Sequence, residues 1–234
     1  MTMNLFGRLS ILAVVALLAS CGSREGARLE LFVDSVDERV IWQTQSILYR
    51  RLVDSVGGPL ADVRTSYFPE HRKLVFEITA GAPPRESLEY LYETRGEYRV
   101  FATDDDGEAV DWITNGDIAA AEGGRSFSTA LVFVSLGPEA TERVGEISGD
   151  NIGTRIEASL DGDYLHESTV TWPMGRFYDF EVESVERAKL LAIVLNHGAL
   201  PVDVIDYADP RIAEVLVAAA EGSGNGSASS ASLR

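Results

Sequence analysis

The order of hydrophobic patterns between residues 28 and 101 is the feature that most constrains the fold. Short apolar segments typical of strands are separated by two segments whose apolar residues recur at helical spacing, and glycine and proline residues mark the breaks between them. The expected elements, in chain order, are a strand at 28–33, a helix at 36–56 ended by Gly57-Gly58-Pro59, strands at 63–68 and 73–79, a helix at 85–94 and a strand at 98–101.

The order strand, helix, strand, strand, helix, strand predicts an α+β fold class, with a ferredoxin-like α/β sandwich over residues 29–102. Asp104-Asp105-Asp106-Gly107 then indicates a solvated turn and a domain boundary. A calcium loop is not expected there, because its oxygen ligands would have to alternate along the chain.

Residues 103–198 predict a second α+β subdomain. Its expected elements are a strand at 130–136, a helix at 139–147, a hairpin of strands 155–160 and 164–170 around Asp161-Gly162, and a helix capped by Ser184 and ended by Gly198. Residues 199–221 predict a return strand at 202–205 and a helix at 211–220, and residues 222–234 form a Gly/Ser-rich tail.

The N-terminus predicts a targeting segment. The apolar run Leu9–Leu18 is too short to span a bilayer, and it leads into Leu18-Ala19-Ser20-Cys21-Gly22, which resembles the lipobox of bacterial lipoproteins. That resemblance implies that residues 1–20 are a signal peptide, that Cys21 carries the lipid (diacylglycerol and palmitate-type acyl chains), and that 21–28 is a linker to the membrane anchor. Under the enterobacterial sorting pattern, Gly22 in place of Asp does not retain a lipoprotein in the inner membrane and so favours the outer membrane. The alternative is an ordinary signal peptide with a chance cysteine.

Charge and residue types narrow the function. The chain has 20 basic and 37 acidic residues, a net charge of −17, so it gains nothing from a phosphate backbone and no nucleic acid partner is expected. The single cysteine excludes an internal disulfide. His71, His166 and His197 fall in unrelated segments and no G-x-S-x-G elbow is present, so we expect no catalytic residues, no metal, no cofactor and no enzyme. An enzyme would need a concave site with converging acids.

Two groups of motifs resemble the first periplasmic region of the protein-export subunit SecD. The first is Gln45–Val53 with Gly57-Gly58 and Lys73–Ile78. The second is Trp112–Ile118, Asp150–Arg155, Leu160-Asp161-Gly162 and His197-Gly198-Ala199-Leu200-Pro201. The resemblance spans roughly residues 30–206 and implies a SecD base and head without the later transmembrane helices of that family. It departs from the family near Ser168, where a proline is expected, and at Met174–Phe180, which replaces a glycine-rich hairpin.

Together with the lipobox, the resemblance implies a lipid-anchored periplasmic module without a proton-driven motor. Its expected partners are translocating or unfolded polypeptide and Sec translocon subunits. Trp172, Met174, Phe177 and Tyr178 lie in an expected loop with Pro and Gly and are the predicted partner-binding residues. The alternatives are that this loop packs on a sheet, and that the chain is an envelope scaffold docking one folded partner.

Overall fold

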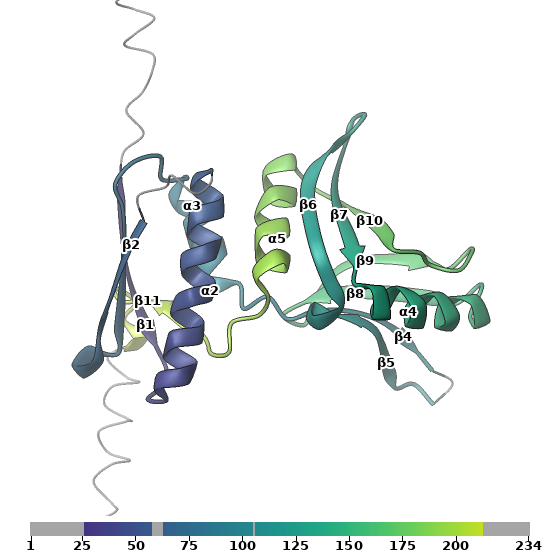
Figure 1. The fold of residues 1–234 in the computed structure, drawn as a ribbon, viewed down its shortest axis with the longest axis horizontal. Coiled ribbons are helices and arrows are strands. Elements are labelled where there is room, and N and C mark those ends of the chain that lie inside the picture. The colour runs from purple at the N-terminus through teal and green to yellow at the C-terminus, as the bar shows by residue number, and fades with distance from the viewer. Residues whose placement is uncertain (1–25, 58–62, 105, 213–234) are drawn as a thin grey trace, which may run out of the picture.

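The computed structural model describes residues 26–57, 63–104 and 106–212, which form two lobes. We call the lobe built from residues 26–57, 63–94 and 204–212 the base, and the lobe built from residues 98–104 and 106–197 the head. In Figure 1 the base lies on one side and the head on the other, with one helix standing between them. The predicted lipobox, most of the predicted helix at 211–220 and the Gly/Ser tail lie outside the described residues.

The base is a four-stranded antiparallel sheet in the spatial order β11-β1-β3-β2. Its elements are β1 (Ala27–Val33), α2 (Glu38–Val56), β2 (Val63–Phe68), the short 3-10 helix η1 (Pro69–His71), β3 (Lys73–Ile78), α3 (Arg85–Glu93) and β11 (Val204–Asp206). Both helices lie on one face of the sheet (Figure 1). This is the ferredoxin-like arrangement, and the predicted α+β fold class is confirmed.

Local sequence explains the limits of α2. The side chain of Asp37 accepts a hydrogen bond from the Arg39 amide at the first turn, and Gly57 ends the helix with φ of 106°, a conformation that favours glycine. Between these ends Ile41, Leu48 and Leu52 recur on one face and are almost fully buried against the sheet. The predicted helix and its glycine stop are confirmed.

The prediction that the strand at 98–101 closes the base sheet is wrong. That strand, β4 (Tyr98–Thr103), pairs with β5 and β8 in the head, and β11 takes the edge position beside β1 instead. The chain leaves the base after α3, builds the whole head and returns after α5. Because strand pairing of this kind is non-local, the strand pattern at 98–101 does not identify its sheet.

The head contains two antiparallel sheets, in the orders β10-β7-β6 and β5-β4-β8-β9. Its remaining elements are β5 (Ala109–Thr114), the 3-10 helix η2 (Asn115–Asp117), β6 (Ile118–Ser126), β7 (Thr129–Leu136), α4 (Pro138–Asp150), β8 (Arg155–Leu160), β9 (Asp163–Thr169), β10 (Phe177–Val182) and α5 (Val185–His197). The hairpin at Asp161-Gly162 is confirmed, since both residues have positive φ. The cap of α5 by Ser184 is also confirmed.

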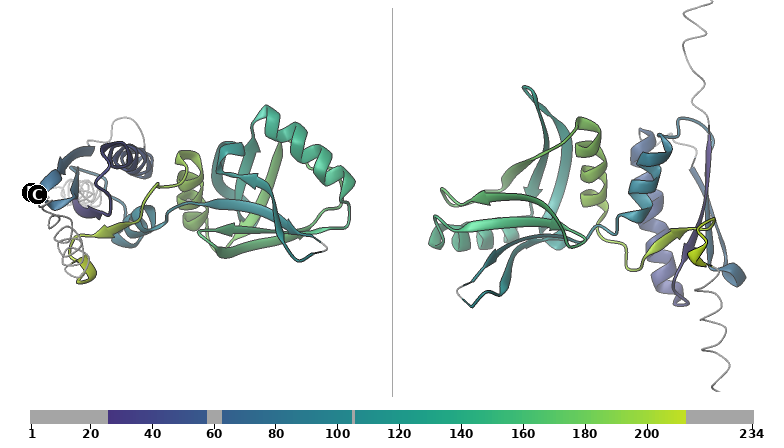
Figure 2. Two further views of the ribbon diagram at one scale, coloured as in Figure 1. Left: turned by 90° about the horizontal axis from the view of Figure 1, so that it is seen from below. Right: turned by 180° about the vertical axis from the view of Figure 1, so that it is seen from behind.

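Helix α5 joins the two lobes (Figure 2). One side of it packs so closely on β6 that a Cβ added to Gly123 would lie 2.2 Å from the carbonyl carbon of Ala188. Asn196 also exchanges two hydrogen bonds with the backbone of Ala121, at 2.6 and 2.8 Å. The opposite side of α5 faces α2 and α3. Across residues 26–57, 63–104 and 106–212, no helix is both long and apolar enough to cross a membrane.

Candidate functional site

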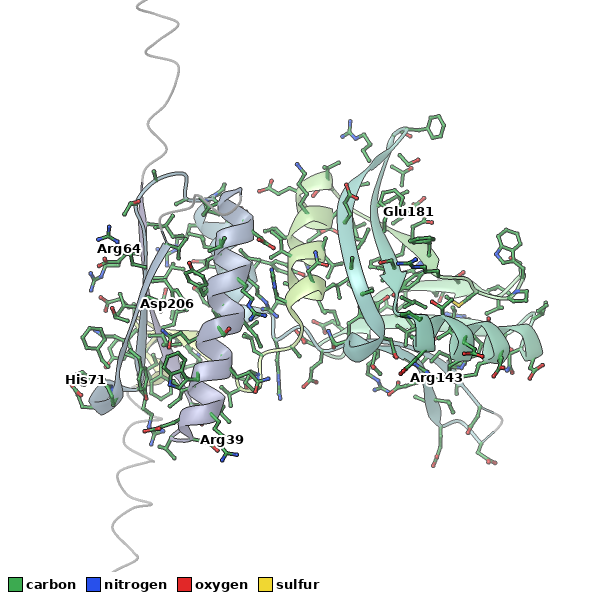
Figure 3. The ribbon with its side chains drawn as sticks, viewed as in Figure 1. Arg39, Arg64, His71, Arg143, Glu181 and Asp206 are labelled. Carbon is green, nitrogen blue, oxygen red and sulfur yellow. The ribbon has the colours of Figure 1, made fainter. Side chains whose placement is uncertain are left out.

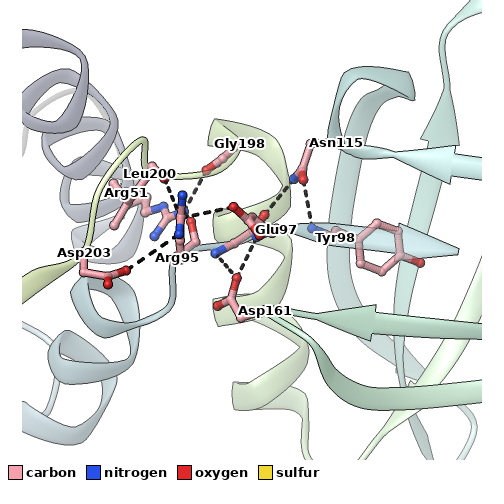
Figure 4. Close-up of polar contacts among 10 residues, drawn as sticks. Arg51, Arg95, Glu97, Tyr98, Asn115, Asp161, Gly198, Leu200 and Asp203 are labelled. Atoms are coloured by element: carbon pink, nitrogen blue, oxygen red, sulfur yellow. Dashed lines mark hydrogen bonds and ion pairs between the residues drawn. The ribbon is translucent and has the colours of Figure 1, made fainter. Parts of the chain in front are cut away.

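A buried arginine holds the junction between base and head (Figure 4). Arg51, on α2, is fully buried and donates from Nη1 to the carbonyl oxygens of Leu91 and Thr94, at 2.8 and 2.6 Å. Its Nη2 donates to the carbonyl oxygens of Arg95 and Gly198, at 3.0 and 2.7 Å. The guanidinium thus ties together the segment that enters the head and the segment that returns from it.

No carboxylate forms an ion pair with Arg51 in the described part of the chain. Burial lowers the pKa of Arg51 to about 10, and the side chain stays charged at neutral pH. Four aligned carbonyl dipoles therefore replace the counter-ion. Gly96 is required beside this group, because its φ is +92° and an added Cβ would lie 2.7 Å from Arg51 Nη2 and 2.8 Å from Val194 Cγ1.

The head side of the junction is fixed by two polar side chains. Asp161 Oδ1 accepts from the amides of Gly96 and Glu97, both at 2.7 Å. Asn115 donates from Nδ2 to the carbonyl oxygen of Gly96 and accepts from the Tyr98 amide, both at 2.8 Å. Asp161 and Asn115 belong to the sequence motifs that resemble SecD, and their structural role is to clamp the first residues of β4 (Figure 4).

The predicted contact segment joins β9 to β10 in the head. Trp172 is 73% exposed and Phe177 is 71% exposed, so both rings are open to solvent. Met174 is half-buried against the head core, and its amide donates to Ser148 Oγ of α4 at 2.7 Å. Two of the four predicted contact residues therefore have exposed rings, and the Arg176 guanidinium lies over that of Phe177, 5.3 Å from its centroid.

Tyr178 lies elsewhere than predicted. It belongs to β10, where it is paired with Val134 of β7, and its side chain is half-buried against the core. Its hydroxyl donates to the hydroxyl of Tyr98 at 3.0 Å, and burial raises the pKa of Tyr178 well above its ordinary value. The expectation that Phe177 and Tyr178 stand in a loop is wrong, because both belong to β10. The alternation along this strand turns Tyr178 inward while Phe177 faces out.

The three histidines occupy separate places. His71 ends η1, and His197 Nε2 lies 2.7 Å from Asp54 Oδ2 at the base–head junction. His166, on β9, stacks on Phe180 with ring centroids 5.9 Å apart, and burial lowers its pKa. Within the described residues no group of three or more His, Cys, Asp or Glu side chains is placed to hold a metal ion.

Two exposed aromatic residues of the β6–β7 hairpin were missed by the sequence reasoning. Phe127, in the two-residue turn, is 100% exposed, and Phe133 on β7 is 41% exposed. The sequence signal for Phe127 was an apolar residue between Ser126 and Ser128 in a short polar segment, which is typical of an exposed turn. The strand β6 was not predicted, because its alanine and glycine residues have low strand propensity.

A two-lobed α+β fold, with a ferredoxin-like base carrying an inserted head, is the class that these features define. Solved structures share this fold. One, described as the structure of SecDF, a membrane component that enhances protein export, matches with a TM-score of 0.61 and 17% identity over 78% of this chain and 99% of that chain. Another, SecDF in its super-membrane-facing form, matches with a TM-score of 0.66 and 17% identity over 85% of this chain and 34% of that chain.

The predicted likeness to the SecD periplasmic region is confirmed at the level of the fold. No model of a protein family matches the sequence. No curated protein matches it either. At 17% identity, the fold is what the chain shares with SecDF, and its activity must be argued from its own surface.

Proposed function

We propose that this chain is a lipid-anchored module on the periplasmic side of the cell envelope that transiently binds translocating or unfolded polypeptide and assists protein export. The observation that carries the proposal is the pair of exposed rings, Trp172 and Phe177, on the head of a fold shared with an export component. Large exposed aromatic groups are enriched where proteins contact partners, and each buries a large area on contact.

The membrane attachment in this proposal rests on the sequence around Cys21. Several acyl chains on one cysteine would hold the chain stably at a membrane without a spanning helix. Gly22 favours the outer membrane. The chain itself would supply contact and release of polypeptide, and no proton-driven step is assigned to it.

Site-specific photocrosslinking in cells tests the proposal. A photoreactive residue at Phe177 should give adducts with many secretory proteins or with translocon subunits, whereas one at Ile152, another exposed site at 58%, should give few. The double variant Trp172→Ser/Phe177→Ser, with the crosslinker moved to Gly175, should lose most adducts and keep its melting temperature. Tyr178 is left unchanged because it is half-buried and packs against the core.

A single folded partner captured in near-stoichiometric yield would contradict the proposal. In that case the chain would be an envelope scaffold that uses the same fold to dock one protein.

A further inference from the structure

One face of the β6-β7-β10 sheet carries an unusual set of side chains. In the strand register, Phe133 of β7 lies opposite Glu122 of β6 and Asp179 of β10, and Leu131 lies opposite Glu181. Residues directly opposite each other point to the same side of an antiparallel sheet, so these groups share one face. Alternation along β10 adds Phe177 to it. We call this surface the acidic aromatic face and define it by Glu122, Phe133, Phe177, Asp179 and Glu181.

The three carboxylates of this face form no ion pair in the described part of the chain, although His166 lies near enough to Asp179 and Glu181 to feel their charge. Glu122, Asp179 and Glu181 are all exposed, and none forms an ion pair within the described residues; Glu181 is labelled in Figure 3. Some acids elsewhere do form ion pairs, as Glu30 does with Lys73 at 3.1 Å and Asp117 does with Arg143 at 2.5 Å. In a chain with a net charge of −17, unpaired acids beside one another raise self-repulsion, which a basic partner would relieve.

The same face is apolar between its charges. Phe133 and Phe177 are 41% and 71% exposed. Next to them lies a hollow of about 450 Å³ lined by Phe127, Leu131, His166, Asp179, Phe180 and Glu181. Leu131 and Phe180 are buried and contribute apolar lining, while the two acids bring charge to the same hollow.

Phe127 stands at the hairpin tip beside this hollow. Its φ is +52°, a conformation that a two-residue hairpin turn normally gives to glycine or asparagine, and its ring is fully exposed. A bulky residue with positive φ costs folding free energy, and a fully exposed ring returns none of it through internal packing. The ring is therefore explained better by an external contact than by folding.

We propose that the acidic aromatic face, with Phe127 at its edge, binds polypeptide segments in which lysine or arginine residues adjoin apolar ones. The apolar side chains of the segment lie on Phe133 and in the hollow, and its cations meet Asp179 and Glu181. This inference rests on the proposed function and adds the chemistry of the client. Lipid is disfavoured as the occupant because the three carboxylates repel anionic headgroups.

Fluorescence anisotropy with the full chain, purified in detergent, tests the inference. Three labelled peptides share their length and apolar residues and carry Lys, Gln or Glu at alternate positions. The Lys peptide should bind most tightly, and its affinity should fall as salt is raised. Asp179→Asn/Glu181→Gln should raise the Kd for the Lys peptide about five- to tenfold and remove the preference over the Gln peptide.

The matched control is Glu142→Gln/Glu146→Gln, which removes two exposed acids from α4 of the same head and should leave the Kd unchanged. Equal affinity for the Lys and Gln peptides, or an unchanged Kd in Asp179→Asn/Glu181→Gln, overturns the inference. If the Gln peptide then still binds and Trp172→Ser weakens it, polypeptide binding stands and only its charge preference fails. Binding of none of the peptides overturns both proposals.

Two other occupants are distinguished by two further variants. If the protein sediments with phosphatidylglycerol vesicles, and Phe127→Ser reduces the sedimented fraction, the face binds lipid. If the molecular mass in solution rises with protein concentration, and Phe133→Ser abolishes that rise, the face binds a second copy of the chain. Either result overturns the inference.

Discussion

Replacing Arg51 by methionine should destabilise the protein by about 2–3 kcal/mol. Methionine keeps an unbranched apolar side chain in the space of the arginine stem but has no donor, so the four carbonyl oxygens at the base–head junction lose their shared partner. The oxygens of Leu91 and Thr94 are bonded in buried surroundings, while those of Arg95 and Gly198 lie at partly buried contacts that water reaches more easily.

The magnitude follows from that difference. Each buried acceptor left without a donor costs about 1–3 kcal/mol, so the two buried oxygens alone cost about 2–6 kcal/mol. Removing a buried cation also removes its desolvation penalty, and Arg51 Nε is itself buried without a partner among the described residues. Both effects reduce the net loss toward the lower half of the range. The loss remains a large share of a total stability of about 5–15 kcal/mol.

Urea unfolding followed by far-ultraviolet circular dichroism and tryptophan fluorescence measures this loss. Trp112 is buried in the head and Trp42 is exposed on the base, so fluorescence weights the head. The control is Arg50→Met, the exposed neighbour on α2, which should change the free energy of unfolding by less than about 0.5 kcal/mol. If Arg51→Met is as stable as Arg50→Met, the carbonyl oxygens do not depend on Arg51 and the reasoning fails.

Three further perturbations test other parts of the structure. Gly96→Ala should cost about 2–4 kcal/mol in urea unfolding, because it combines positive φ with a clash against Arg51, and a change below about 1 kcal/mol would contradict the tight junction. Phe127→Gly should raise the free energy of unfolding by about 0.5–1 kcal/mol, and with it the melting temperature, because glycine adopts φ of +52° without strain. A lower melting temperature would show that the ring packs internally. Burial lowers the pKa of His166 in the folded protein below its ordinary 6.5, so as pH falls the unfolded chain takes up this proton before the folded protein does. The contribution of neutral His166 to stability is therefore complete above pH 6.5 and is lost as pH falls through the lowered folded-state pKa. His166→Phe should flatten the pH dependence just below 6.5, and NMR titration of His166 at or above 6.5 would refute the assignment.

Local sequence signals were sufficient for the elements with their own caps and turns. The helix that ends at Gly57, the helix that begins after Ser184 and the hairpin at Asp161-Gly162 each carry the residue type that their backbone geometry requires. These features depend on a few neighbouring residues. The arrangement of a base and a head was predicted from the SecD-like motifs, because no local pattern indicates how distant elements pack together.

The strands were less predictable because their partners lie far away in the sequence. β4 and β11 are both short, and only the complete chain decides which of them joins the base sheet. β6 has alanine and glycine where strands usually have larger residues, because α5 approaches too closely for a side chain at Gly123. The same non-local packing placed Tyr178 in the core, although its neighbours in the sequence are typical of a loop.

Charged side chains have different surroundings at the base–head junction and on the acidic aromatic face, and this difference connects the fold to its proposed role. At the junction a buried cation donates hydrogen bonds to four backbone oxygens, which ties the head to the base. On the acidic aromatic face Asp179 and Glu181 form no ion pair within the described residues, and beside them Phe127 is held in a strained conformation with its ring in solvent. We expect that removing the two acids or the ring leaves the fold intact or more stable. Groups that a structure keeps at such a cost are better explained by a partner than by the protein's own stability.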